Sequence, residues 1–153
     1  MMKRKTTTNQ IVNRRARYDY AIEHTYEAGL VLSGAEVKSL RSGHGNLRGA
    51  YIMIKDGELW LNNATISPTV TNKNSLSEDN QTRLRKLLVK VRELQELTAA
   101  KEQGLTIIPL RILTKKRFIK IEIATARGLK KYDKRELIKQ RDTTRDLNRE
   151  ISQ

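Results

Sequence analysis

Hydrophobic and polar residues alternate from Tyr18 to Leu32, and this alternation predicts a long β-strand. One parity of the alternation should share a face of that strand, and it carries Tyr20, Ile22, His24 and Tyr26. Gly29 lies inside the same segment and marks a bend or a bulge. The folded body is therefore expected to begin on a strand.

A short helix should follow, because Ser33 and Glu36 have the spacing of a capping box. Their side chains can each accept a hydrogen bond from a backbone N–H that the first helical turn leaves unpaired. Gly43 would end the helix, and Lys38 and Arg41 would face solvent. This spacing assigns Glu36 a structural role.

Further along, Asp56-Gly57 separates two alternating stretches, which predicts a β-hairpin because both residues tolerate the positive φ of a tight turn. Another strand is expected over 64–70, and a polar loop over 71–80. From Thr82 to Gly104 the leucines recur at helical spacing, which predicts one long helix. Leu88 would lie on its buried side, and Arg83 and Arg85 on the opposite, exposed side.

Two more strands are predicted over 105–113 and 117–126, and Pro109 suits an edge position or a bulge in the first of them. The order of elements indicates a fold that is mainly β with α. Its expected form is an OB-like closed antiparallel β-barrel with flanking helices and a disordered basic C-terminal tail. An open sheet backed by helices is the alternative.

Beyond Gly128 the apolar periodicity stops, although nine Lys or Arg and five Asp or Glu lie between Arg127 and Gln153. A helix with no apolar face is unstable alone in water, because packing supplies most helical stability. We expect three parts: a flexible basic arm over 1–12, an OB-like RNA-binding barrel over 13–128, and a tail over 129–153. The tail should be disordered in the free protein and helical on a charged partner.

Charge narrows the function, because 31 Lys and Arg against 17 Asp and Glu leave a formal charge of +14. Such an excess indicates a polyanionic partner, most often nucleic acid. With five Tyr, one Phe and one Trp, the chain has few stacking platforms for single strands, so a folded RNA fits better. No apolar run approaches the roughly 20 residues of a membrane span. We expect a cytoplasmic protein that binds no membrane.

Enzymatic activity is not expected. Asp19, Glu23 and Glu27 could line only one edge of a strand, and His24 and His44 have no partner in the sequence pattern. No phosphate-binding glycine loop is visible, and a chain without cysteine has no thiolate ligands. We therefore expect no catalytic residues, no metal and no cofactor.

Several segments resemble the SmpB family, the SsrA-binding proteins that partner transfer-messenger RNA (tmRNA). The resemblance covers roughly residues 13–141 and is carried by "NRRARYDY", "YEAGLVLSGAEVKSLRSG", "GELWL", "ISP", "TRLRKLL" and "ARGLKKYDKRE". It implies an OB-like barrel and a role in trans-translation, the rescue of stalled ribosomes. The barrel would bind the tRNA-like domain of tmRNA, and the tail would enter the ribosome.

The resemblance also implies which residues bind RNA. Asn13, Glu27 and Lys120 match positions that the family uses in RNA binding, and so does Leu88, for which we favour a core position. With neighbouring basic residues, the expected tmRNA-binding set is Asn13, Arg14, Arg15, Arg17, Glu27, Lys38, Arg41, Lys120 and Arg127. A carboxylate such as Glu27 would repel phosphate, so it should face a base edge or a ribose, or else hold a basic side chain.

In the tail, the segment "YDKR" matches the family's Asp-Lys-Arg step. The expected ribosome-binding set is Gly128, Lys130, Lys131, Tyr132, Asp133, Lys134, Arg135, Lys139 and Arg141. Lys and Arg would contact phosphate, Tyr132 could stack near the decoding site, and Asp133 could cap the following helix. The tail would test whether the message channel is empty.

The resulting hypothesis is a monomeric adaptor that delivers tmRNA, together with elongation factor Tu, to stalled ribosomes. Two alternatives stay open on the sequence. One is a general structured-RNA-binding or ribosomal protein with no preference for tRNA-like folds. The other is a metal-dependent nucleic-acid-processing enzyme that uses the strand carboxylates.

Overall fold

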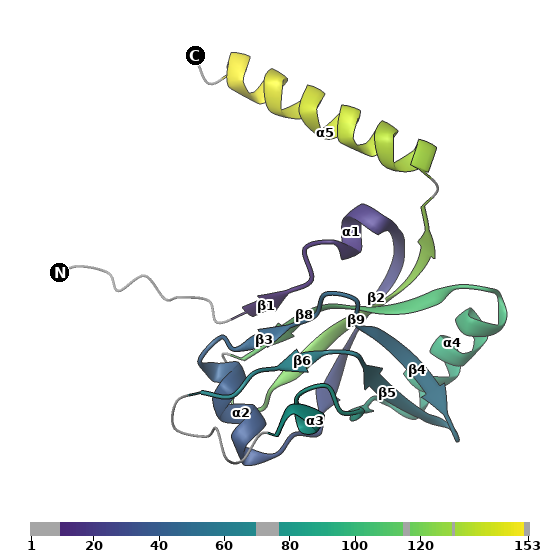
Figure 1. The fold of residues 1–153 in the computed structure, drawn as a ribbon. Helices are drawn as coiled ribbons and strands as arrows, with labels where there is room; N and C mark the ends of the chain where they lie inside the picture. Colours follow the sequence, from purple (N-terminus) through teal and green to yellow (C-terminus); the bar gives the residue numbers. More distant parts are fainter. Residues whose placement is uncertain (1–9, 70–76, 115–116, 130, 152–153) are drawn as a thin grey trace.

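The computed structural model describes residues 10–69, 77–114, 117–129 and 131–151, and within the last range it leaves out the side chains of 131–134, 137 and 149–151. These residues form a mixed α/β fold built on antiparallel strands (Figure 1). In chain order the elements are β1 (Gln10–Val12), α1 (Ala16–Asp19), β2 (Tyr20–Leu30), α2 (Gly34–Arg41), β3 (Gly45–Asn46), β4 (Tyr51–Lys55), β5 (Glu58–Asn62), β6 (Thr65–Ile66), α3 (Glu78–Gln81), β7 (Arg85–Leu88), α4 (Val91–Glu102), β8 (Thr106–Leu113), β9 (Lys120–Gly128) and α5 (Lys131–Ile151).

The strands close into a ring of hydrogen-bonded pairs. The main sheet has the order β1-β8-β4-β5-β7-β2-β9, and β9 pairs again with β8, so the pairing returns to β8. β3 and β6 form a separate two-stranded sheet. The expected antiparallel architecture with flanking helices is confirmed, and the closure decides against an open sheet.

Apolar side chains of the ring form the main core. Ile107, Ile121 and Ile123 from β8 and β9 are fully buried, and α2 and α4 contribute Leu40 and Leu97 to the same cluster. The strand predicted over 117–126 is confirmed in β9, where the partly buried Lys120 and Glu122 alternate with the buried Ile121 and Ile123.

A turn and a bulge predicted from local chemistry are confirmed. Asp56 and Gly57 have φ values of 53° and 73°, and they connect β4 to β5 as a hairpin. The register between β8 and β9 shifts between Pro109 and Arg111, which confirms a bulge at the proline.

Gly29 does not mark the irregularity of β2, because the register shift lies between Ile22 and His24. Its role is close approach: a Cβ at Gly29 would lie 3.3 Å from the Cβ of Leu88 on the neighbouring strand β7. The expected strand over 64–70 is also shorter than predicted, since β6 contains only Thr65 and Ile66 among the residues described there.

The long helix predicted from Thr82 to Gly104 is wrong in its first third. The helix is α4, Val91–Glu102, and the segment before it is strand β7. β7 fills the place between β5 and β2, where Leu87 pairs with Leu59 and Leu30. Leucines spaced three and four apart suit a helix locally, but the strand pairing that closes the ring outweighs this preference.

The N-terminal boundary also differs from the prediction. Gln10–Val12 were expected in the flexible arm, but they form β1 and pair with β8, because Ile11 is buried against the core. The short helix α1 was not predicted. The rest of the expected arm lies outside the described residues.

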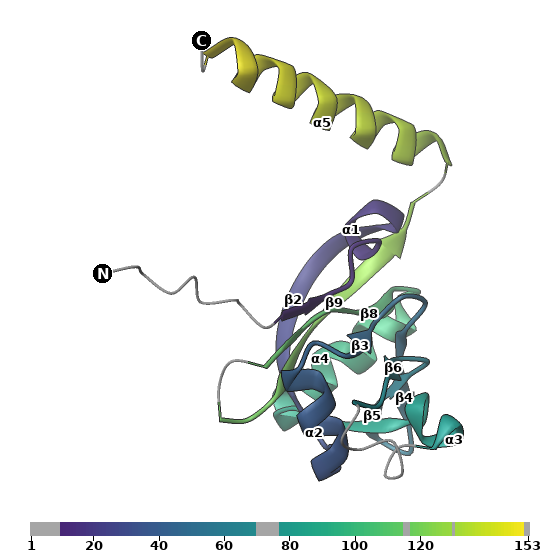
Figure 2. The same ribbon diagram turned by 60° about the vertical axis from the view of Figure 1, so that its left-hand side comes forward.

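Residues Lys131–Ile151 form one helix, α5, which projects away from the ring (Figures 1 and 2). The helical form expected on the ribosome is thus the form that the structure has, and disorder in the free protein stays a prediction. None of the helices described is both long enough and apolar enough to cross a membrane.

Candidate nucleic-acid interface

Glu27 and Lys120 come together on adjacent strands, β2 and β9. The Lys120 ammonium lies 3.3 Å from Glu27 Oε1, and the two side chains are 44% and 47% exposed. The ion pair lowers the repulsion that a lone carboxylate would exert on a nearby phosphate. Glu27 can therefore accept a hydrogen bond from a base amine or a 2′-hydroxyl while Lys120 contacts the backbone.

Two further ion pairs link neighbouring strands, one between β8 and β9 and one between β9 and β2. Arg111 Nη2 on β8 lies 2.8 Å from Glu122 Oε2, and Arg127 Nε lies 3.0 Å from Glu23 Oε1. Arg127 stays 70% exposed, so pairing with Glu23 does not remove it from solvent. Glu23, Glu27 and Glu122 are thus each paired with a cation from a neighbouring strand.

An apolar groove of about 340 Å³ lies beside Lys120. Its walls include Leu88, which is 55% exposed, and Phe118, which is 70% exposed. The core position predicted for Leu88 is therefore wrong, because β7 turns Leu87 inward and Leu88 outward. The Arg117 guanidinium lies 5.7 Å from the centre of the Phe118 ring, a cation–π distance.

Of the two basic residues predicted on α2, Lys38 is exposed. Arg41 is exposed as well, as predicted, and it is also anchored: its Nη1 donates to the Thr114 carbonyl at 3.1 Å and its Nη2 to the Arg117 carbonyl at 2.9 Å. It thereby ties α2 to the connection between β8 and β9. The spacing predicted that Arg41 faces solvent, but it did not predict these two hydrogen bonds.

At the N-terminal end, Asn13 is tied to β8. Its side-chain amide donates to the Pro109 carbonyl at 2.9 Å, and its backbone N–H donates to Leu110 at 2.8 Å. Arg14, Arg15 and Arg17 follow on the surface around α1. The hydrogen bonds of Asn13 to β8 therefore fix the backbone just before the exposed arginines of this segment.

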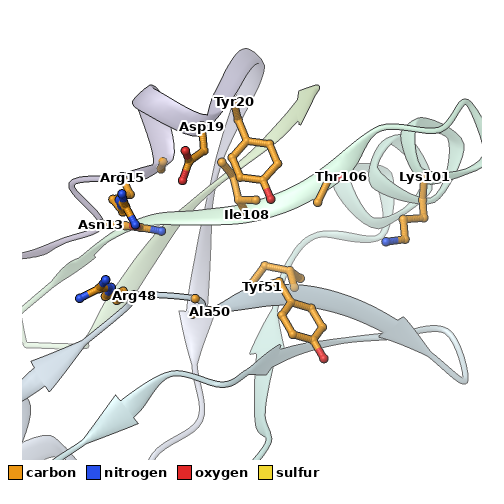
Figure 3. A pocket seen from close by; sticks show the side chains of 13 residues that line it. Asn13, Arg15, Asp19, Tyr20, Arg48, Ala50, Tyr51, Lys101, Thr106 and Ile108 are labelled. Atoms are coloured by element: carbon orange, nitrogen blue, oxygen red, sulfur yellow. The ribbon is translucent and has the colours of Figure 1, made fainter. Parts of the chain in front are cut away.

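Next to these arginines is a cleft of about 420 Å³, which we call the α1–β4 cleft (Figure 3). It lies between α1 and β8 on one side and β4 on the other. The side chains that give it polar and aromatic character are Asn13, Arg15, Asp19, Tyr20, Arg48, Tyr51 and Lys101. Arg48, Tyr51 and Lys101 were not predicted as site residues: Arg48 and Tyr51 lie close together in the sequence, but Lys101 is about 50 residues further on and only the fold brings it to the cleft.

Glu36 has a larger structural role than its capping box. Both capping hydrogen bonds with Ser33 are present, and the carboxylate also pairs with Arg83 and with the buried Arg85. Burial alone would raise the pKa of Glu36, but the Ser33 N–H and the two guanidiniums lower it. Burial in turn lowers the pKa of Arg85. Arg85, predicted on an exposed helical face, is in fact fully buried.

The tail begins beside α1. Gly128 ends β9 opposite Tyr20, and the Leu129 N–H donates to the Asp19 carbonyl at 2.9 Å. Arg135, Lys139 and Arg141 are exposed on α5. α5 starts at Lys131, so Asp133 lies within its first turn and cannot be its N-cap. Lys130 and the side chains of 131–134 lie outside the described residues.

Within the ranges that the structure describes, no three His, Cys, Asp or Glu side chains converge as a metal site. Glu23 and Glu27 face separate cations, as the ion pairs above show. Exposed cations, a polar strand face and a basic helix are together typical of a nucleic-acid-binding protein.

Comparison with known proteins identifies the family. The family model described as "SmpB protein" matches residues 10–153. An SsrA-binding protein of Syntrophomonas wolfei is 50% identical over 142 residues, covering 92% of this chain and 89% of the relative. Another, of Synechococcus sp. (strain JA-3-3Ab), is 46% identical over 142 residues and 92% of both chains. The chain belongs to the SmpB family, a family of non-enzymatic RNA-binding proteins.

A solved structure supports the same assignment. A chain described as "tmRNA-SmpB: a journey to the center of the bacterial ribosome" has a TM-score of 0.66 and 43% sequence identity. The match covers 80% of this chain and 86% of that one. The residue-level roles predicted above are not resolved by these likenesses and stay predictions.

Proposed function

We propose that this protein is the tmRNA-binding adaptor of trans-translation. The observation that carries the proposal is family membership at 46–50% identity over 92% of the chain. The exposed Glu27–Lys120 pair supports it, because it offers an acceptor for base edges or riboses inside a strongly cationic surface. The protein would act in the bacterial cytoplasm as a monomer, and it would perform no chemistry of its own.

The closed ring would work as an OB-like barrel that grips the tRNA-like domain of tmRNA. The face formed by β2 and β9 is our candidate for that contact, with Glu27, Lys120 and Arg127 as the residues exposed on it. Guanidinium and ammonium groups would contact phosphates and set the position of the RNA. The body would then take the place of the part that the tRNA-like domain lacks, and elongation factor Tu would complete the delivery complex.

The tail would report whether the message channel is vacant. α5 leaves the ring without packing along it, so it is free to enter a narrow tract lined by ribosomal RNA (Figure 2). Its exposed cations, Arg135, Lys139 and Arg141, would contact phosphates there. A message in that tract would exclude the helix both by volume and by its own phosphate contacts with the wall.

Truncation after Gly128 tests this division of labour. The truncated chain should bind the tRNA-like domain nearly as well as the full chain, and it should fail to support peptide tagging on stalled ribosomes. The tail holds eight basic and five acidic residues, so its removal lowers the formal charge by three. An unrelated RNA hairpin, measured at the same salt, shows how much affinity this charge change alone removes. Loss of tRNA-like domain binding beyond that control would refute the proposal.

Glu27→Gln tests the proposed face, with Glu58→Gln as a matched control on an exposed ion pair elsewhere in the ring. Glu27→Gln should weaken binding to the tRNA-like domain while the melting temperature stays unchanged, because its half-exposed ion pair contributes less than about 1 kcal/mol to stability. A parallel collapse of the melting transition would make Glu27 a structural residue instead.

A further inference from the structure

The α1–β4 cleft is positively charged at both ends (Figure 3). Arg15 and Arg48 lie at one end, where they also line a second, smaller cavity together, and Lys101 of α4 lies at the other. No ion pair among the described residues engages these three cations, whereas the cations of the β2–β9 face are all paired with carboxylates. Asp19 is the acidic residue among the described side chains that line the cleft.

Two tyrosines lie between these charged ends (Figure 3). Tyr51 is 45% exposed, and its hydroxyl accepts a hydrogen bond from the Asn62 amide at 2.7 Å. Tyr20 is partly buried and packs against the small cluster that includes Ile108. An exposed ring whose hydroxyl is already held offers its face to a ligand at little cost in side-chain entropy.

We propose that the α1–β4 cleft binds one unpaired nucleotide of an RNA. The base would stack on Tyr51, and the phosphates on its two sides would meet Arg15 and Arg48 at one end and Lys101 at the other. A cavity of about 420 Å³ lies within the roughly 300–1,000 Å³ of small-ligand sites. This proposal rests on the proposed function in one respect: the RNA would be either tmRNA or ribosomal RNA, the two RNAs that the proposed function involves.

The place of the cleft in the fold favours the ribosome as the source of the nucleotide. Asp19 lines the cleft, and its carbonyl accepts the Leu129 N–H at the root of the tail. An RNA that surrounds the start of α5 would therefore pass over the cleft. The tRNA-like domain is the other source, and the experiment separates the two.

Binding of the full chain is measured with three probes: the tRNA-like domain transcript, small ribosomal subunits without message, and an unrelated RNA hairpin. Tyr51→Leu should lower the affinity for at least one of the first two by about fivefold to a hundredfold, because it removes the stacking platform. Arg48→Gln should lower the same affinity severalfold, and Tyr51→Phe should stay within about twofold, because the ring remains. Lys55→Gln, on the same strand but outside the cleft, removes an exposed charge and is the matched control.

A loss confined to the ribosomal subunit assigns the nucleotide to ribosomal RNA, and a loss confined to the transcript assigns it to tmRNA. The proposal is overturned when Tyr51→Leu and Arg48→Gln both bind all probes as Lys55→Gln does. A wild-type chain with no preference for the tRNA-like domain over the hairpin would refute the proposed function instead. A Tyr51→Leu loss on every probe would still support the cleft in that case.

Discussion

Replacing Glu36 by Gln removes one charge from the buried network that joins α2 to β7. Glu36 is 1% exposed at its side chain and Arg85 is fully buried, so neither charge is solvated by water. The remaining Arg85 N–H groups donate to the carbonyls of Ala64, Arg83, Asn80 and Gln81 at 2.8–3.2 Å. Glutamine keeps an acceptor for the Ser33 N–H, so the capping contact survives. Its amide nitrogen would then face the Arg85 Nε–H and cannot accept from it, so the variant loses both the charge and the acceptor for Arg85.

Breaking a buried ion pair by removing one partner costs about 3–5 kcal/mol, because the other charge stays buried without compensation. At about 2–4 °C per kcal/mol for a chain of this size, the melting temperature should fall by about 6–20 °C. Urea unfolding at neutral pH followed by circular dichroism measures the free energy of unfolding directly. Glu58→Gln, at a half-exposed pair 2.9 Å from Lys86, should cost less than about 1 kcal/mol and is the control.

The pH dependence gives an independent check. The pKa of Glu36 lies below its ordinary value of 4.5 in the folded chain. The folded state therefore binds fewer protons than the unfolded state near that pH, so stability is fully present above about pH 4.5 and falls as the pH drops through the lowered pKa. Glu36→Gln should reduce this acid-dependent loss. Equal free energies of unfolding for Glu36→Gln and Glu58→Gln at neutral pH would refute the reasoning.

Three further outcomes follow from the described contacts. In urea unfolding, Leu87→Ala should lower the free energy of unfolding by about 2–5 kcal/mol because Leu87 is buried. Leu88→Ala should change it by no more than about 0.5 kcal/mol because Leu88 is 55% exposed, and similar losses for the two variants would contradict the orientation of β7. Gly57→Ala should lower the free energy of unfolding by about 1–2 kcal/mol because φ at Gly57 is 73°. Gly34→Ala should be neutral or stabilising because an added Cβ would have nothing within 4 Å, and melting curves in the reverse order would contradict the hairpin turn. The logarithm of the affinity for the tRNA-like domain should fall linearly with the logarithm of salt concentration in filter binding, and a flat response would exclude phosphate contacts as the main source of affinity.

Local chemistry was sufficient to predict several elements. The β4–β5 hairpin depends on Asp56 and Gly57, and the start of α2 depends on Ser33 and Glu36, so neighbours in sequence determine each of them. The bulge at Pro109 follows in the same way, because a proline has no N–H for the ladder. These features need no knowledge of the distant chain.

Strand β7 could not be predicted in this way. Its residues have helical spacing, and what makes them a strand is the pairing with β5 and β2, which lie more than 20 and more than 50 residues earlier in the chain. The partners of Glu36 were missed for a related reason. Arg83 and Arg85 are 47 and 49 residues away, and a charged residue two positions from another arginine normally indicates a solvated surface.

The same distinction applies to the residues that we propose as RNA contacts: some follow from the sequence and others only from the fold. Glu27 and Lys120 could be proposed because each matches a position that the family uses in RNA binding, and the β2–β9 pairing places their charges 3.3 Å apart. Arg48 and Tyr51 are neighbours in sequence, but only the fold brings Arg15 and Lys101 to the same cleft. Hydrophobic periodicity cannot predict a surface whose residues are brought together by the closure of the ring. The net charge of such a surface, however, contributes to the composition of the chain. The excess of +14 therefore predicted a polyanionic partner correctly in kind, while the positions of the contacts had to come from the fold.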